Sequence, residues 1–352
     1  MRAIVLERAR RLRIEEREVP SPAPGELLLK VEACALGGRD YESWYHGLGK
    51  LPRVPGSEIV GTVEALGNAA SPSHPSGSSA SPDSGTEEAK IIPIFRRGYD
   101  SIADGSRVVV SPYLQSRENT LQEVVGYDRD GGLQEYMCLP VEHCFEVEAD
   151  RDIRGLACVP AFAEALAYLD ELAVEAGEVV VVSGAEGIGV LTAMAANLRG
   201  ATAVLVDPKQ ARLEQASEIG IPYVVNPFRS SVPDELGWIT PTGIADVVVE
   251  TTGNRDALPG LFAILGPGSR LGFVHGMEYD ISIATLVDFG LRLVGLGSLL
   301  PNFREAIELT RGTEVAKAVS LTLPLEELPD RMMSIARSRE AVLKAVVAVS
   351  TA

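Results

Sequence analysis

Three glycines, Gly184, Gly187 and Gly189, lie close together near the middle of the chain, directly after the apolar run Val179–Val182. Glycine lets a backbone turn tightly, and it lets a ligand approach main-chain amides that no side chain obstructs. A helix that begins at such a turn points its unpaired N–H groups and the positive end of its dipole at the ligand. This combination is typical of a turn that binds the pyrophosphate of a dinucleotide.

An acidic residue follows the glycines at the spacing that such a site requires. Asp207 comes about 20 residues after Gly189, at the end of a second apolar run. A carboxylate there can accept both hydroxyls of an adenosine ribose and would repel a 2′-phosphate, which favours NAD over NADP. Glu186 stands where the commonest fingerprint has its second glycine, and its charge beside the phosphate path argues against tight binding. The alternative is a tight turn without a ligand.

Alternating strands and helices are expected around this turn. The run Val179–Val182 is β-branched throughout and too short for a helix, which is typical of a parallel strand buried on both faces. The alternation of such runs with helical segments predicts an α/β fold with a doubly wound parallel sheet. Further strands are expected at Ala203–Val206, Asp246–Glu250, Arg270–Val274 and Leu291–Gly295, and helices at Gln210–Ile219 and around Arg255–Leu265.

The two ends of the chain have a different character. Residues 1–66 are rich in strand-like runs separated by Pro and Gly, whereas residues 68–89 consist largely of Ser, Pro, Gly and Ala, which predicts a mobile loop. A helical segment, Leu156–Leu172, leads into the central sheet. The other predicted strands are Arg2–Leu6, Leu27–Ala33, Ile59–Leu66, Ser106–Val110, Leu133–Leu139 and a closing strand Ala345–Val349, with helices after Asn302 and near Leu325–Ala336.

Composition bounds the function. A chain of 352 residues with 46% hydrophobic residues has enough material for two cores. The net charge of −17 argues against nucleic acid or an anionic membrane as a partner. No signal peptide and no membrane span is visible, so we expect a cytoplasmic protein with a small-molecule substrate. The four cysteines form no C-x-x-C pair and are expected to be free thiols.

A series of motifs runs along the chain: Ala33–Asp40, Pro55–Gly61, Gly105–Val108, Gly131–Tyr136, the glycine turn, Glu250–Gly253 and Lys344. In this order they resemble the medium-chain dehydrogenase/reductase superfamily, and within it the zinc-dependent alcohol and polyol dehydrogenases. The resemblance implies a Rossmann sheet at residues 151–297 and a β-rich GroES-like domain made of residues 1–150 and 298–352, with a low-complexity insertion at 68–104. It also implies an active-site cleft between the two domains and a homodimer or homotetramer.

The resemblance also implies which residues bind NAD. The pyrophosphate and ribose would lie at the glycine turn and at Asp207, and His275 would approach the nicotinamide or a subunit interface. The expected cofactor-binding residues are Gly184, Gly187, Ile188, Gly189, Asp207, Thr252, Val274 and His275.

The zinc ligands of the family are largely missing. Gly37 and Ser57 stand where the family has a cysteine and a histidine, and only Cys158 remains from the set of about three that a catalytic zinc needs. The segment between Val110 and Gly132 holds no cysteine for a structural zinc. We therefore expect no zinc. An alternative is a site rebuilt from Cys34, Glu58 and Cys158.

Without zinc, another group must stabilise the charge that develops on the substrate oxygen. The candidate catalytic residues are Arg39, Asp40, His46 and Glu58. Arg39 occupies the place of the family's Ser/Thr proton relay, and its guanidinium could replace the charge of the metal. Its structural alternative is an ion pair with Asp40 or Glu58. These two carboxylates could act as a base or orient one, or only tie loops together, and a lone histidine such as His46 is more often structural.

Two tyrosines, Tyr41 and Tyr45, are further candidates, and loops at Tyr41–Lys50 and Ser111–Arg129 are expected to shape the substrate site. Three functions follow from these residues. The first is an NAD(H)-dependent oxidoreductase that interconverts an alcohol or polyol and a carbonyl without catalytic zinc. The second is a zinc-free reductase of an activated C=C bond or a quinone. The third is a dinucleotide-binding protein without catalysis.

Overall fold

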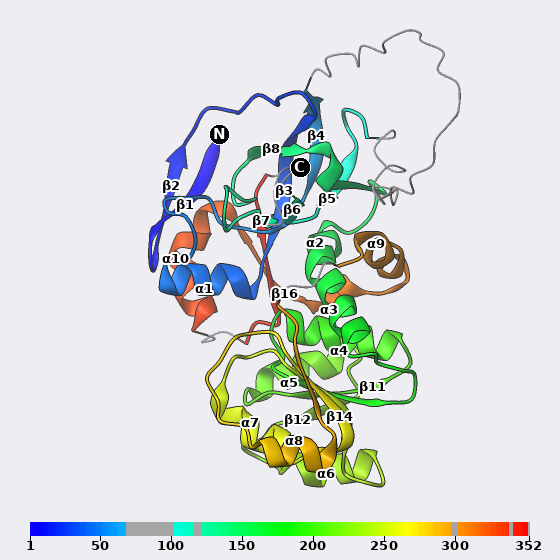
Figure 1. The fold of residues 1–352 in the computed structure, drawn as a ribbon. Coiled ribbons are helices and arrows are strands. Elements are labelled where there is room, and N and C mark those ends of the chain that lie inside the picture. The colour runs from blue at the N-terminus through cyan, green and yellow to red at the C-terminus, as the bar shows by residue number, and fades with distance from the viewer. Residues whose placement is uncertain (68–101, 116–121, 298–300, 338–340, 351–352) are drawn as a thin grey trace, which may run out of the picture.

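The computed structural model describes residues 1–67, 102–115, 122–297, 301–337 and 341–350. The chain forms two lobes, each built on one large sheet (Figure 1). The segment expected to be mobile, 68–89, and nearly all of the expected insertion 68–104 lie outside the described residues.

The central part of the chain forms a six-stranded sheet in the order β12-β11-β10-β13-β14-β15, and all its strand pairs are parallel. The strand before the glycine turn, β10, is buried at every residue, as a strand covered on both faces must be. The predicted doubly wound sheet is therefore confirmed. Its strands are β10 (Val179–Ser183), β11 (Thr202–Val206), β12 (Tyr223–Val225), β13 (Ala245–Glu250), β14 (Leu265–Phe273) and β15 (Arg292–Gly295).

Helices connect these strands and cover the sheet (Figure 1). They are α4 (Ile188–Leu198), α5 (Gln210–Glu218), α6 (Val232–Ile239), α7 (Leu258–Phe262) and α8 (Ile283–Phe289).

The second lobe combines both ends of the chain. Its seven-stranded sheet follows the order β16-β17-β3-β4-β5-β9, with β8 paired to β3. The last strand, β17, pairs antiparallel with β3, so that Val347 lies opposite Cys34. This is the GroES-like arrangement that was expected. The strands are β3 (Glu26–Leu36), β4 (Glu58–Leu66), β5 (Arg107–Val110), β8 (Tyr136–Pro140), β9 (Cys144–Val147), β16 (Val319–Pro324) and β17 (Lys344–Ala348).

The remaining elements of the described residues are smaller. Two hairpins, β1–β2 and β6–β7, stand apart from the large sheet. The remaining elements are β1 (Arg2–Arg8), β2 (Arg11–Glu16), β6 (Tyr113–Gln115), β7 (Gln122–Val124), α1 (Gly38–His46), α2 (Ile153–Ala157), α3 (Val159–Glu171), α9 (Phe303–Gly312) and α10 (Leu328–Ala336).

Two local predictions were wrong. The helical segment expected at Leu156–Leu172 is divided at Cys158 into α2 and α3. Pro160 stands in the first turn of α3, where its missing N–H costs nothing, and this residue favours the start of a new helix. The loop expected from Tyr41 is also wrong up to His46, because α1 covers Gly38–His46.

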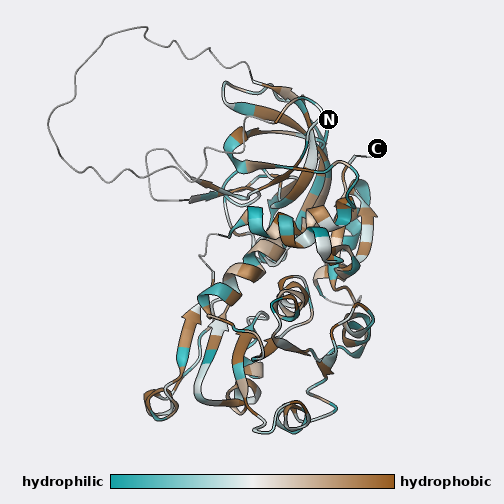
Figure 2. Ribbon diagram, turned by 90° about the vertical axis from the view of Figure 1, so that its right-hand side faces the viewer, coloured by the Kyte–Doolittle hydropathy of each residue, from teal (hydrophilic) through white to brown (hydrophobic). Residues whose placement is uncertain are grey.

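One hydrophobic core runs from one lobe into the other. Phe162 of α3 is fully buried in a cluster that holds Val60 and Val109 of one sheet and Val180 and Val182 of the other. Figure 2 shows hydrophobic residues, in brown, along strands of both sheets. The helix α3 therefore ties the lobes together. None of the helices in the described ranges is both long and apolar enough to cross a bilayer.

Candidate active site

The glycine turn connects β10 to α4 as the sequence predicts. Gly184 and Gly187 have φ values of +105° and +50°, in the left-handed region that L side chains rarely adopt. A Cβ on Gly189 would lie 1.9 Å from the carbonyl oxygen of Gly184, so no larger residue fits there. The close packing of this turn against α4 is the geometry that places a helix N-terminus at bound phosphates.

Asp207 directly follows β11 and lies beside this turn. One of its carboxylate oxygens accepts the N–H of Ala185 at 2.9 Å, and the other accepts the N–H of Lys209 at 2.7 Å. Arg212, in the first turn of α5, lies 3.5 Å from Asp207 and 2.6 Å from Glu186. The carboxylate that the sequence flagged as unfavourable, Glu186, is therefore paired with a guanidinium.

The remaining expected cofactor residues lie along one path from this turn. Thr252 donates its backbone N–H to Glu250 at 2.8 Å, and its methyl group would lie 2.7 Å from a Cβ on Gly184. Ile188, Val274 and His275 line a cavity of about 340 Å³. The structure thus brings the turn, Thr252 and this cavity together.

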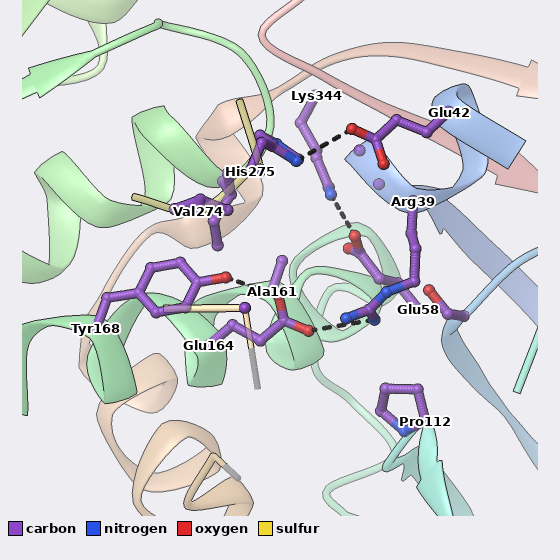
Figure 3. Close-up of a pocket in the computed structure, with 16 residues that line it drawn as sticks. Arg39, Glu42, Glu58, Pro112, Ala161, Glu164, Tyr168, Val274, His275 and Lys344 are labelled. Atoms are coloured by element: carbon purple, nitrogen blue, oxygen red, sulfur yellow. Dashed lines mark hydrogen bonds and ion pairs between the residues drawn. The ribbon is translucent and has the colours of Figure 1, made fainter. Parts of the chain in front are cut away.

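The cavity, which we call the cleft pocket, is lined by residues of both lobes (Figure 3). Three acid–base pairs stand on its wall. They are Glu58 with Lys344, Arg39 with Glu164, and Glu42 with His275.

The first pair is almost completely buried. Lys344, at the start of β17, donates to Oε1 of Glu58, at the start of β4, at 2.7 Å. Burial raises the pKa of Glu58 to about 7 even though the ammonium group opposes this shift. The other oxygen, Oε2, is buried and has no hydrogen-bond partner among the described residues. Because a buried carboxylate oxygen without a donor is costly, this atom is suited to accept a hydrogen bond from a ligand.

The second pair corrects the expected partners of Arg39. Arg39 does not pair with Asp40 or Glu58, since its Nη1 lies 3.9 Å from Glu164 and its Nη2 donates to the Tyr113 hydroxyl at 3.3 Å. The Tyr113 hydroxyl donates to one oxygen of Glu164 at 2.5 Å, and the Tyr168 hydroxyl donates to the other at 3.3 Å. The guanidinium is thereby held on the pocket wall by residues of α3 and β6.

The third pair joins the lobes. Nδ1 of His275, just after β14, lies 3.1 Å from Oε1 of Glu42 on α1 (Figure 3). The hydrogen bond with Glu42 raises the pKa of His275, and the same bond lowers the pKa of Glu42.

The other candidate residues do not line the cleft pocket. The carboxylate oxygens of Asp40 accept the backbone N–H groups of Gly37 at 3.0 Å and Gly56 at 2.9 Å, so that this residue ties two loops together. His46 is exposed at the end of α1 and packs its ring against Tyr45 at 4.9 Å. Tyr41 packs against the core of its own lobe.

The residues at the family's zinc positions do not fit a catalytic zinc ion. Zinc needs about three protein ligands, and thiol ligands bind it as thiolates. Burial raises the pKa of Cys158 to about 12, and Glu58 is paired with Lys344. A Cβ on Gly37 would lie 2.6 Å from Oε1 of Glu58, so that the glutamate fills the space a ligand there would need.

The alternative site built from Cys34, Glu58 and Cys158 is not formed. Across the described ranges, no group of three His, Cys, Asp or Glu side chains is placed to hold a metal ion. Cys34 is buried in β3, and all four cysteines are free.

Comparison with known proteins agrees with this architecture. Residues 23–81 match the family model of the alcohol dehydrogenase GroES-like domain, and residues 187–311 match that of the zinc-binding dehydrogenases. The chain belongs to the medium-chain dehydrogenase/reductase superfamily. It is an NAD(P)-dependent oxidoreductase of the alcohol dehydrogenase-like type.

Individual relatives are distant but cover most of the chain. An uncharacterized zinc-type alcohol dehydrogenase-like protein of Haemophilus influenzae is 26% identical over 98% of this chain and 97% of its own. Sorbitol dehydrogenase of Gallus gallus is 25% identical over 84% of this chain and 80% of its own length. An alcohol dehydrogenase of Escherichia coli, solved with NADH, has the same fold with a TM-score of 0.80, 20% identity and 99% coverage of both chains.

Sequence reasoning missed part of the pocket wall. Glu164 is a lone carboxylate in the apolar stretch of α3. Lys344, quoted from the sequence as a motif but not as a site residue, is a lone cation at the start of an apolar strand. Such isolated charges in buried elements are a usable signal, because charged side chains are almost never fully buried unless they are paired. Tyr113, Tyr168 and Glu42 carry no comparable signal.

Proposed function

We propose that this oxidoreductase interconverts an alcohol or polyol and a carbonyl compound with NAD(H), and that it does so without catalytic zinc. The observation that supports this most directly is the Glu58–Lys344 pair. It stands on the pocket wall beside the family's metal position, and Oε2 of Glu58 lacks a donor. A carboxylate poised in this way can perform the proton transfer that accompanies hydride transfer.

The residues present fit the dinucleotide. The turn at Gly184–Gly189 would hold the pyrophosphate and Asp207 the adenosine ribose, while Ile188, Val274 and His275 would border the nicotinamide end. Bound NAD supplies the hydride acceptor in one direction, and NADH supplies the donor in the other.

Glu58 is the residue that we assign to the proton. The substrate hydroxyl would donate to Oε2, and the carboxylate would take this proton during oxidation and return it during reduction. A pKa of about 7 suits both directions, because neither protonation state is then rare near neutral pH. The ammonium of Lys344 and the guanidinium of Arg39 provide fixed positive charge on the same wall for the substrate oxygen.

The Arg39–Glu164 pair would bind a further hydroxyl of the substrate. A hydroxyl both donates and accepts, so it can bond to a carboxylate and a guanidinium at once. The cations Lys344 and Arg39 are each matched by a carboxylate, and so is His275 when it is protonated. This balance favours a neutral, hydroxylated substrate over an anionic one.

A zinc-free reductase of an activated C=C bond or a quinone is the second candidate. The unsuitable zinc donor set favours it, since such acceptors are already electrophilic and need less polarisation. A dinucleotide-binding protein without catalysis is the third.

The setting of the enzyme is also part of this proposal. The net charge of −17 supports a small-molecule substrate rather than nucleic acid or a membrane surface as its partner. We further propose a cytoplasmic homodimer or homotetramer.

Two measurements test the proposed function. We expect elemental analysis of the purified protein to find substoichiometric zinc, and turnover to survive chelation. A panel of NADH-dependent reductions should show faster turnover of hydroxylated ketones than of enones and quinones. One zinc per chain together with loss of activity on chelation would refute the metal-free reaction. The reverse order of rates would support the second candidate, and NADH binding without any turnover the third.

A further inference from the structure

We propose that Glu186 sets the preference of this enzyme for NAD(H) over NADP(H) by engaging the guanidinium of Arg212, which a 2′-phosphate would otherwise bind. This inference rests on the proposed use of NAD(H). It adds a specificity-determining pair that the glycine turn and Asp207 do not by themselves provide.

Arg212 lies between Glu186 and Asp207. Its Nη2 lies 2.6 Å from Oε2 of Glu186 in the glycine turn, and its Nη1 lies 3.5 Å from Oδ2 of Asp207 at the end of β11. The guanidinium therefore spans from the expected pyrophosphate site to the expected ribose site. Arg212 is only 5% exposed, so its charge is held in a protein environment, where screening by water is weak.

In dinucleotide-binding folds, an acid at this strand end accepts the ribose hydroxyl of NAD, whereas a nearby arginine accommodates the 2′-phosphate of NADP. This chain has both residues side by side. Asp207 is fixed by the N–H groups of Ala185 and Lys209. The side chain that would change its partner when a 2′-phosphate binds is therefore that of Arg212.

Arg212 can bond strongly to either a carboxylate or a phosphate, since both match its planar fork. Glu186 stands where the usual fingerprint has glycine, and it engages Arg212 at the shorter of the two distances. Removing its charge should make the guanidinium more available to a 2′-phosphate.

NADH and NADPH separate this effect from any repulsion of the pyrophosphate, because both carry the same pyrophosphate. The experiment measures dissociation constants of NADH and NADPH, by cofactor fluorescence, for the wild type, Glu186→Gln, Arg212→Gln and the double variant. We expect Glu186→Gln to raise affinity for NADPH relative to NADH by about tenfold, as for one charge-assisted hydrogen bond. In the Arg212→Gln background the same substitution should leave the ratio unchanged.

Asp170→Asn is the matched control. It removes one negative charge from the chain by breaking a surface pair with Arg199, 2.5 Å apart, and should leave the ratio unchanged. An unaltered ratio in Glu186→Gln, or an equal shift with and without Arg212, would overturn the inference. If Arg212→Gln does not fold, the comparison of Glu186→Gln with Asp170→Asn decides. A wild type that binds no NADH would instead refute the proposed function.

Discussion

The carboxylate of Glu58 has two roles in the cleft pocket. Glu58 neutralises the buried ammonium of Lys344 through one oxygen and leaves the other without a donor. Burial raises its pKa to about 7, far from the ordinary value of a glutamate. A strongly perturbed group in a cleft is a candidate for catalysis, and here the geometry points in the same direction.

The pH dependence of the reaction should report this group. In oxidation, the base must be deprotonated, so we expect kcat/KM to rise as the pH increases through about 7 and then level off. In reduction, the protonated acid is needed, and the same step should appear as a fall. Glu58→Gln should lose this step and reduce the rate by roughly 10²- to 10⁴-fold, the usual value of general acid–base catalysis.

Initial rates across the neutral range, with the best substrate from the panel, provide the measurement. Glu164→Gln is the control, since it alters the same pocket but should raise KM and keep the step, moved to lower pH because the charge of Glu164 raises the pKa of Glu58. A step that persists in Glu58→Gln would assign the proton transfer to another residue.

The pocket residues that could be predicted from the sequence are those that lie within its motifs or next to them. Glu58 follows the Pro-Gly-Ser motif and Arg39 lies in another motif, so both were expected at the pocket, and both line it. The partners of Arg39 could not be found in this way. Glu164 and Tyr113 reach it from α3 and β6, elements distant in sequence from α1, and only the folded arrangement of the chain brings the three side chains together.

At the scale of elements, α1 and β14 create the contact between Glu42 and His275. The helix belongs to one lobe and the strand to the other, so this pair reports their relative position (Figure 3). Glu42 is about half exposed, and exposed pairs contribute little to stability. The pair is therefore better regarded as a probe of the cleft than as a source of stability.

Substituting Glu42 should be visible at His275. The carboxylate raises the pKa of His275, and the histidine lowers the pKa of Glu42, so the ion pair persists between these two pKa values and is lost as the pH rises through that of His275. We expect Glu42→Gln to lower the pKa of His275. Proton NMR titration can follow it, because the chain has only four histidines.

Glu142→Gln provides the comparison for this titration. Glu142 lies 3.8 Å from His143, so the substitution should affect His143 and leave His275 unchanged. A His275 titration that does not respond to Glu42→Gln would show that the two side chains are apart in solution.

Elements were predictable where the local pattern was unambiguous. The run before the glycines is β-branched and wholly apolar, and it forms β10 almost as predicted. The helix α1 was missed because its sequence is largely polar and it begins at the second of two glycines, which favour a loop; only three of its residues, Asp40, Ser43 and Trp44, are buried. The break at Cys158 depends on Pro160, whose effect an apolar periodicity does not reveal.

On the surface of the whole molecule, the helix α8, beside one edge of the parallel sheet, exposes large apolar side chains. Ile283 and Val287 of α8 are 71% and 74% exposed, and no residue of that helix is buried. The neighbouring strand β15 ends the sheet and pairs only with β14 in the described part of the chain. Exposed apolar patches and open strand edges are typical of subunit contacts.

We expect the proposed homo-oligomer to form through this edge. A charge at the patch would be buried on association, so Val287→Asp should shift the molar mass measured by light scattering toward that of the monomer. Trp238→Asp is the control, since this residue is 89% exposed on α6, away from α8 in sequence, and should leave the mass unchanged. A monomeric wild type would contradict the proposal.

The apolar interior shared by the two lobes has a practical consequence for engineering. Phe162 belongs to a cluster to which both sheets contribute, so neither lobe has a complete hydrophobic core of its own. A fragment that ends on either side of α3 would expose part of this hydrophobic core to solvent, so we expect it to aggregate when it is expressed alone. Recombining this enzyme with a relative would therefore require transferring α3 together with the valines of both sheets that belong to the same cluster.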